Sequence, residues 1–233
     1  MNPQPTEPPS NSSSFRFLQK ILSKKPETLV LVLDLETNGL SPRYSVLSVT
    51  AVKYRCQYTQ WEKVGRFHRF YYSRESENPE ALRVNGLTKD RIRREREGKG
   101  WPEFFDEDYE FVEFCQGIDL VVGHNINFDL KFLPFLKDVA RFCTMKSHTT
   151  DKFPSLSKLA HRYGLSVDSG RLHEGAYDVE LTACIFEKIL QDLEGYIVLE
   201  KQQEKQKRKH KASVETSALE PSRALEIRSR LGL

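Results

Sequence analysis

Apolar runs in the first half of the chain have the length and composition of β-strands. Residues 28–33 are a continuous run of Leu and β-branched residues, which is typical of a central strand buried on both faces. Residues 44–54 and 64–72 are expected to form two further strands, with a turn at Ser-Pro-Arg-Tyr between the first two. Residues 119–123 are a short apolar strand. These runs predict a sheet at the centre of the fold.

Elsewhere, apolar residues recur every three or four positions, which indicates amphipathic helices. The first such stretch carries Phe15, Leu18, Ile21 and Leu22 and is expected to end near Pro26. Further helices are expected at residues 104–115, 128–136 (kinked by Pro134), 156–163 and 176–193. Strands followed by helices, with one helix between strands, indicate an α/β layered domain without internal repeats.

Acidic side chains stand beside these apolar runs, where an ionised carboxylate is costly unless something pairs with it. Asp34 and Glu36 end the first strand, in LVLVLDLETNGL. Residues two apart on a strand point to the same face, so both carboxylates can reach one metal pair. The alternative is two surface acids, because Asp-x-Glu is a common sequence. In the segment 37–40 that follows, Gly39 would let the backbone approach a substrate closely.

Two later segments add acids. Asp129, in VVGHNINFDLKFL, is expected in the first turns of a helix, where the helix dipole would also favour an acid. For His124, a hydrogen-bonded polar group is preferred to a metal ligand. His173 and Asp178 form H-x4-D, with the acid early in the last helix and the histidine in the loop before it. A single loop histidine is usually only exposed.

Taken together, the acids and the histidine indicate a two-metal phosphodiesterase. Carboxylates are the natural ligands of Mg²⁺ and Mn²⁺, with phosphate as co-ligand. Histidine accepts a proton near neutral pH.

Composition narrows this interpretation only slightly. The net charge of +3 is too mild to establish a nucleic-acid partner. The four cysteines are scattered without a CxxC pair, so free thiols are preferred to a zinc site or disulfides. Apolar runs are too short to span a bilayer and the N-terminus does not look like a secretory signal, so no membrane association and a cytoplasmic location are expected. The charge-dense stretch 91–100 is expected to be a solvated loop rather than a binding patch.

The conjunction of motifs resembles the DEDDh subgroup of the DnaQ-like 3′–5′ exonucleases, the family of the proofreading (epsilon) subunit of bacterial DNA polymerase III. LDLETNGL is similar to the first motif of that family, GHNINFD to the second and H-x4-D to the third. RVNGLT and FPSLSKLAHRYGL are similar to two connecting segments. The resemblance covers roughly residues 29–193.

The resemblance implies a ribonuclease H-like α/β fold, a five-stranded mixed β-sheet flanked by α-helices. It also implies two divalent cations, Mg²⁺ or Mn²⁺, bound by Asp34, Glu36, Asp129 and Asp178, with His173 as general base. The positions that match nucleotide contacts of the family are Thr37, Asn38, Gly39, Leu40, Val84, Asn85 and Phe128. Among these, Leu40 and Phe128 would hold the terminal base by stacking or wedging.

Four positions depart from the pattern of the family, and none of them is a predicted metal ligand or the base. Asn85 stands where histidine is frequent, and Ser48 where glutamate is frequent. Cys143 stands where aspartate is frequent, and Gly175 where alanine is frequent.

The sequence therefore predicts a two-metal 3′–5′ exonuclease that releases nucleoside 5′-monophosphates, of a proofreading or repair type. DNA is the preferred substrate, as single strands or frayed 3′ ends, and RNA trimming is the alternative. A non-catalytic polymerase- or nucleic-acid-binding subunit is a less favoured alternative. We divide the chain into a disordered or loosely helical segment (1–25), the DEDDh exonuclease domain (26–196) and a charged tail (197–233). The apolar end of the tail, at 225–231, suggests a polymerase or other protein partner.

Overall fold

The computed structural model describes residues 12–57, 60–148 and 153–231, in two compact units that divide between Gln191 and Asp192. The Pro- and Ser-rich stretch 1–11 lies outside the described residues. Among the helices that the structure describes, none is both long and apolar enough to cross a bilayer.

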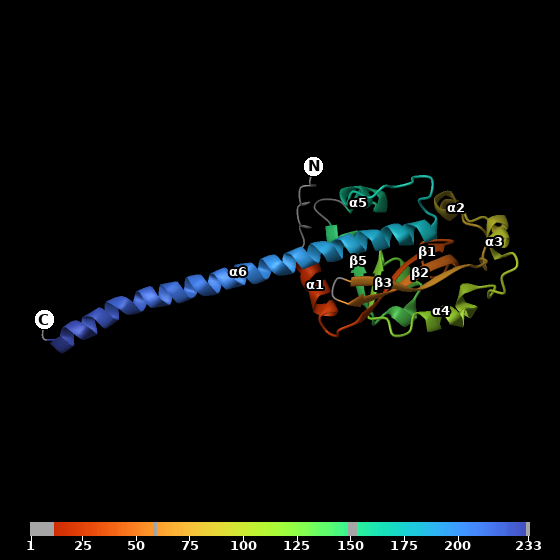
Figure 1. The fold of residues 1–233 in the computed structure, drawn as a ribbon. Helices are drawn as coiled ribbons and strands as arrows, with labels where there is room; N and C mark the ends of the chain where they lie inside the picture. The colour runs from red at the N-terminus through yellow and green to blue at the C-terminus, as the bar shows by residue number, and fades with distance from the viewer. Residues whose placement is uncertain (1–11, 58–59, 149–152, 232–233) are drawn as a thin grey trace. The chain divides into compact units, whose positions relative to one another are not determined.

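A five-stranded mixed sheet forms the centre of the first unit, in the order β3-β2-β1-β4-β5 (Figure 1). The strands are β1 (Thr28–Thr37), β2 (Val46–Gln57), β3 (Gln60–Phe70), β4 (Leu120–Gly123) and β5 (Ala140–Cys143). The pairs β1–β2 and β2–β3 are antiparallel, while β1–β4 and β4–β5 are parallel. The predicted fold class is confirmed, and β1 is the middle strand.

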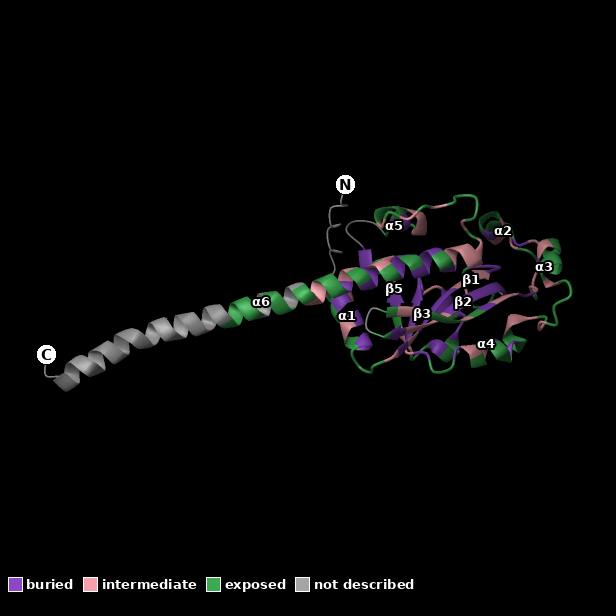
Figure 2. Cartoon of the chain, in the orientation of Figure 1, coloured by how far each residue is buried: buried purple, intermediate pink, exposed green. Residues whose placement is uncertain are grey.

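The two faces of β1 serve different purposes. Leu31, Leu33 and Leu35 point to one face and belong to the main hydrophobic core. Val30 and Val32, both 0% exposed, point to the other face, which they share with the side chains of Asp34 and Glu36. Figure 2 shows the sheet as the most buried part of the unit.

Helices cover both faces of this sheet. The helices are α1 (Ser12–Leu22), α2 (Pro79–Asn85), α3 (Lys89–Arg96), α4 (Tyr109–Phe114), α5 (Leu156–Arg162) and α6 (Gly175–Leu231). Single 3₁₀ turns lie at Phe105–Glu107, Asp129–Lys131, Pro134–Leu136 and Lys146–His148. The ring of Phe186 in α6 lies 5.4 Å from both Trp61 and Phe142, so α6 crosses one face from β3 to β5. On the other face, the ring of Phe111 in α4 lies 5.0 Å from Phe67.

Trp61 and Phe67 pack against opposite faces although they are an even number of residues apart. A bulge in β3 explains this, because Lys53 pairs with Gly65 while the next residue, Tyr54, pairs with Lys63. The extra residue reverses the alternation along β3. The β2–β3 hairpin therefore packs against α4 on one face of the sheet and against α6 on the other.

Two helical predictions were right in part. The first helix forms as α1, and its four predicted apolar residues are at most 9% exposed. The last helix begins at Gly175 and continues to Leu231, well beyond residue 193. The sequence of the tail was compatible with either a helical extension or disorder. The structure shows a helix that continues to Leu231. Side chains from residue 209 onward are outside the described set, so the apolar stretch 225–231 stays a prediction.

Three other expectations were wrong. The stretch 91–100 is not a loop, because most of it forms α3, which Thr88 caps through a hydrogen bond from Arg91 N–H to its Oγ1. The single helix expected at 128–136 is two 3₁₀ turns, because Leu133, which precedes Pro134, has a non-helical ψ of 63°. The helix expected at 104–115 is broken at Asp108, whose side chain caps α4.

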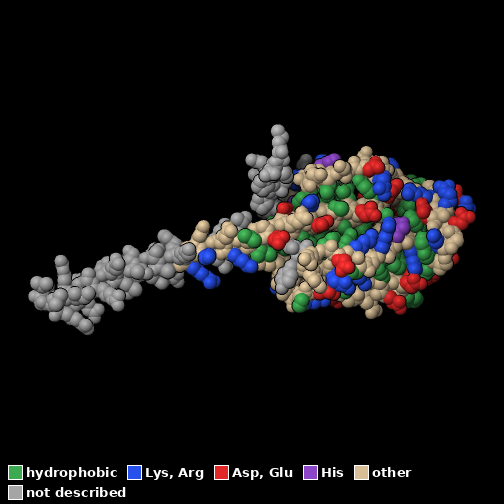
Figure 3. All heavy atoms as spheres, viewed as in Figure 1, with side chains coloured by type: hydrophobic (Ala, Val, Ile, Leu, Met, Phe, Trp, Pro, Cys, Tyr) green, Lys and Arg blue, Asp and Glu red, His purple; other side chains and the backbone are tan. Residues whose placement is uncertain are grey.

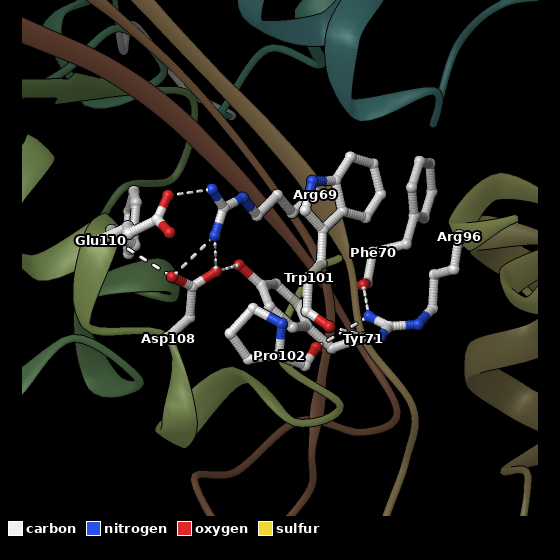
Figure 4. Close-up of polar contacts among 9 residues, drawn as sticks. Arg69, Phe70, Tyr71, Arg96, Trp101, Pro102, Asp108 and Glu110 are labelled. Atoms are coloured by element: carbon white, nitrogen blue, oxygen red, sulfur yellow. Dashed lines mark hydrogen bonds and ion pairs between the residues drawn. The ribbon is translucent and has the colours of Figure 1, made fainter. Parts of the chain in front are cut away.

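Asp108 is also the centre of a buried polar network (Figure 4). Its carboxylate accepts from Arg69 Nη1 at 3.0 and 2.9 Å and from the hydroxyl of Tyr71 at 2.7 Å. Arg69 also pairs with Glu110. In the same figure, Arg96 donates to the carbonyl oxygens of Trp101 and Pro102. These bonds fix the segment after α3 against β3.

Candidate active site

Three of the predicted metal ligands converge where β1 ends and α6 begins. Asp34 and Glu36 project from β1 toward the face that α6 covers, and Asp178 lies in the first turn of α6. One carboxylate oxygen from each of the three lies within 4.8 Å of the others. Two segments that are far apart in the sequence therefore supply one acidic cluster.

The cluster contains carboxylate oxygens without partners. Among the described residues, Asp34 Oδ2 and Asp178 Oδ1 are buried and accept no hydrogen bond. Burial, together with repulsion from the neighbouring acids, raises the pKa of Asp34 well above its ordinary value. The same causes raise the pKa of Glu36 to about 8. Such a site carries an excess of negative charge, and divalent cations with oxygen ligands fit it.

Asp129, the fourth predicted ligand, lies beside the cluster but outside the group of three. It is 3% exposed, and its Oδ1 accepts a hydrogen bond of 3.0 Å from the backbone N–H of Leu35. Burial raises the pKa of Asp129 to about 7, against the opposing effect of that hydrogen bond. The charge of Asp129 in turn raises the pKa of Asp34 and Glu36. The 3₁₀ turn Asp129–Lys131, which follows β4, thus places a further carboxylate beside the acidic cluster.

His173 lies in the loop that leads into α6, as expected. Its φ of 67° is in the left-handed region, which is uncommon for residues other than glycine. Its backbone N–H donates to Asp178 Oδ2 over 3.1 Å, while the residue itself is exposed. This bond fixes the histidine next to the acidic cluster and leaves the imidazole accessible to solvent and substrate.

A cleft of about 460 Å³ opens beside Glu36 and is lined by six of the seven predicted nucleotide contacts. These six are Thr37, Gly39, Leu40, Val84, Asn85 and Phe128. Leu40 is 78% exposed and Val84 58% exposed, which is unusual for a pair of large apolar side chains at one cleft. The cleft therefore offers apolar contacts next to the carboxylates.

The seventh predicted contact, Asn38, does not line this cleft. Its amide nitrogen donates to Ser73 Oγ and Glu75 Oε1, both at 3.0 Å, and its Oδ1 accepts from the N–H of Asn78 at 2.9 Å. Asn38 is 3% exposed. Its side chain joins the end of β1 to the segment that leads into α2, so the structure gives it a positioning role.

The structure explains why position 39 is a glycine, which the sequence did not reveal. A Cβ there would lie 2.4 to 2.8 Å from ring atoms of Tyr44. The close approach that requires glycine is therefore to this ring.

Three of the four positions that depart from the pattern of the family lie around the cluster, and the fourth, Cys143, ends β5. Asn85 donates to the carbonyl oxygen of Thr37 at 3.2 Å, and its side chain also lowers the pKa of Glu36 through a hydrogen bond. Ser48 pairs with Glu36 across the β1–β2 ladder. A Cβ on Gly175 would lie 3.1 Å from Thr50 Oγ1 and 3.5 Å from Asp34 Oδ2. The start of α6 therefore packs closely against β1 and β2.

Several other residues near the site were not predicted as site residues. Thr50 Oγ1 and His68 Nδ1 lie 2.7 Å apart on β2 and β3, next to Asp34 in the ladder. Arg91 lies in the stretch that was expected to be a loop, although the capping residue Thr88 was a usable indication of a helix. His124 has the partner that was expected for it, because its Nδ1 lies 3.0 Å from Thr144 Oγ1.

This fold, with acids at the end of its central strand, is that of a nuclease domain. The profile of the RNase T exonuclease family matches residues 31–186. The chain therefore belongs to this family, the DnaQ-like DEDD exonucleases, as its sequence predicted.

Individual relatives are distant. The chain is 27% identical over 197 residues to the PolC-type DNA polymerase III of Staphylococcus aureus, which covers 76% of this chain and 13% of that protein. The chain thus spans only a small part of this polymerase.

Two solved structures share the fold. Exonuclease X in complex with 5′-overhanging duplex DNA has a TM-score of 0.51 at 19% identity, over 70% of this chain and 91% of that one. Escherichia coli Exonuclease I in complex with a dT13 oligonucleotide has a TM-score of 0.54 at 14% identity, over 74% of this chain and 43% of that one.

Proposed function

We propose that this chain removes nucleoside 5′-monophosphates one at a time from the 3′ ends of DNA, with two divalent cations, Mg²⁺ or Mn²⁺. The observation that carries the proposal is the three-acid cluster of Asp34, Glu36 and Asp178, with two buried oxygens that lack partners. An apolar-rimmed cleft adjoins the same cluster. Cations bound to the acids would sit where a phosphate at the mouth of this cleft could join them.

Asp34, Glu36, Asp129 and Asp178 would hold the cations. Bound cations would lower the pKa of a coordinated water and neutralise charge on the phosphate. His173, whose backbone N–H holds it beside Asp178, would accept the proton of the attacking water as general base.

The cleft residues would position the end of the strand. Leu40 and Val84 would contact the terminal base at the rim, and Phe128 would stack against it. Thr37 and Asn85 would line the sugar side. Such contacts require an unpaired terminal base, which favours single strands and frayed ends.

DNA is the proposed substrate because relatives of known structure were solved with DNA. Exonuclease X was solved with duplex DNA that carries a 5′ overhang, and Exonuclease I with a DNA oligonucleotide. The match to a DNA polymerase III supports the same substrate and a role in proofreading or repair. RNA trimming is the alternative, because the same motifs resemble those of RNA-trimming relatives.

A non-catalytic subunit with this fold is less consistent with the site. Buried acids without partners destabilise a protein that binds no cation, so a protein without catalysis would gain stability by losing them. A cytoplasmic location and a protein partner of the tail stay predictions from the sequence.

The experiment is cleavage of matched DNA and RNA oligonucleotides, labelled at either end, with Mg²⁺, Mn²⁺ or excess chelator. The 5′-labelled DNA should shorten in single-nucleotide steps, and the 3′-labelled DNA should release a labelled mononucleotide at once. Undiminished cleavage in excess chelator would contradict the two-metal proposal. Faster cleavage of RNA than of DNA would select the alternative substrate.

The cleft is tested separately. Leu40→Ala and Val84→Ala should raise KM about 5- to 150-fold, since stacking and wedging contacts contribute about 1–3 kcal/mol per base. Val64→Ala, at an exposed valine in the bulge of β3, is the matched control and should leave KM unchanged. Equal effects of all three substitutions would show that the cleft does not bind the terminal nucleotide.

A further inference from the structure

A second cavity, of about 200 Å³, also adjoins Glu36 but is otherwise lined by different residues from the cleft. Glu36 is the single residue that lines both spaces among the residues that the structure describes. His173 and Gly175 line the second cavity from the start of α6, and Arg91 lines it from α3. This cavity therefore meets the acidic cluster from the side of the predicted base.

Arg91 is the only lysine or arginine among the described residues that line this cavity. Its backbone is fixed, because its N–H donates to the capping Oγ1 of Thr88 and the next residue, Ile92, is 3% exposed. Its Nη1 lies 3.4 Å from the position that a Cβ on Gly86 would occupy, so the guanidinium lies against the turn between α2 and α3.

The guanidinium of Arg91 has unused hydrogen-bonding capacity. In the described part of the chain, it takes part in no ion pair within 4.0 Å. Two other arginines of α3 have partners, because Arg93 pairs with Asp90 and Arg96 donates to backbone carbonyl oxygens. The charge of Arg91 acts on the site, because it lowers the pKa of Glu36. Figure 3 shows Lys and Arg side chains interspersed with acids on the visible face of this unit. Arg91 is half-buried, whereas Arg93 and Arg94 on the same helix are exposed.

Hydrolysis of the phosphodiester changes the charge of the phosphate that would lie beside Arg91. A bond forms between the water oxygen and phosphorus, the bond from phosphorus to the 3′-oxygen breaks, and the 3′-oxygen leaves with a proton. The phosphodiester carries one negative charge, whereas the released monoester carries about 1.5 to 2 at neutral pH. A fixed guanidinium with free donors recognises the monoester more strongly.

We propose that Arg91 binds the phosphate of the terminal nucleotide and holds the nucleoside 5′-monophosphate product, an inference that rests on the proposed exonuclease function. The other charged groups of the cavity are Glu36, Glu95 and Glu174, with the imidazoles of His68 and His173. Among the described residues that line this cavity, Arg91 is the one permanent cation available to the phosphate.

The test measures binding of thymidine 5′-monophosphate and of thymidine to the Mn²⁺-loaded protein by calorimetry. Arg91→Gln should weaken binding of the monophosphate about 10- to 100-fold, the size expected for hydrogen bonds to a charged group, and leave thymidine unchanged. Arg91→Lys should recover part of the loss. Arg94→Gln, an exposed arginine on the same helix, is the matched control and should bind both ligands as the parent does.

Mn²⁺ affinity, titrated separately, distinguishes phosphate binding from an effect on Glu36. Removal of a positive charge should leave Mn²⁺ affinity equal or higher. An unchanged monophosphate affinity in Arg91→Gln, or an equal loss for thymidine, would overturn the inference. Absence of oligonucleotide cleavage by the parent would overturn the exonuclease function instead, because the binding measurement does not depend on turnover.

Discussion

Glu36 should contribute strongly to the way in which the stability of the metal-free protein depends on pH. Burial and the neighbouring acids raise its pKa from 4.5 to about 8 in the folded protein. Between these values the folded protein binds the proton more tightly than the unfolded chain does. The free energy of unfolding therefore falls as the pH rises through this window. Glu36 alone should lower it by about 1 kcal/mol at pH 5 and about 4 kcal/mol at pH 8.

The assay is urea unfolding of chelator-treated protein at several pH values between these limits, for the parent and for Glu36→Gln. The variant should be more stable than the parent, by a difference that grows by about 3 kcal/mol over the series. Glu113→Gln, at an exposed glutamate on α4, should show no such growth. Mn²⁺ at 100 times its Kd should add about 2.7 kcal/mol to the parent and less to the variant. A difference that is independent of pH would refute this reasoning.

Four further predictions concern the site, the fold and the tail. Asp178→Asn should abolish turnover in the standard cleavage assay while circular dichroism shows an intact fold, because the change is nearly isosteric and removes a ligand charge. His173→Ala should lower kcat about 10²- to 10⁴-fold, the usual contribution of a general base. Asp108→Ala should cost about 3–5 kcal/mol in urea unfolding, because it leaves the half-buried guanidinium of Arg69 without its buried partner. A chain that ends at residue 196 should keep its rate on short single strands and bind long DNA more weakly at low salt.

Matched controls separate these effects from general damage. Asp106→Ala removes an exposed partner of Arg74 and should cost less than about 1 kcal/mol. Near-normal turnover of Asp178→Asn, or a full rate after His173→Ala, would mean that these side chains have no part in the chemistry. Loss of all activity in a folded chain that ends at residue 196 would show that the tail completes the active site.

The sequence predicted the sheet and the pair of acids on β1 because both depend on the local pattern of residues along a strand. Asp34 and Glu36 share a face with Val30 and Val32, which follows from the two-residue period of a strand. The approach of Asp178 required the resemblance to a known family, because no local pattern indicates that α6 begins at the end of β1. The strand β5 was likewise only implied by the five-stranded fold.

Other features depend on contacts between distant segments. Asn38 looked like a substrate contact, but its side chain is used by the segment 73–78. The helix α3 has one buried apolar residue, Ile92, so its hydrophobic period is too weak to distinguish it from a loop. Arg91 was therefore assigned to solvent, although the fold places it next to Glu36.

The backbone of Leu35 has a consequence for the interpretation of variants. Its side chain belongs to the core, while its N–H holds Asp129 and its two neighbours are Asp34 and Glu36. A mutational scan scored by cleavage alone would rank Leu35 with the acids, although its side chain has no chemical role. A parallel scan scored by protein abundance would separate the two classes. Substitutions of Leu35 should lower both scores, whereas substitutions of the acids should lower cleavage and preserve abundance.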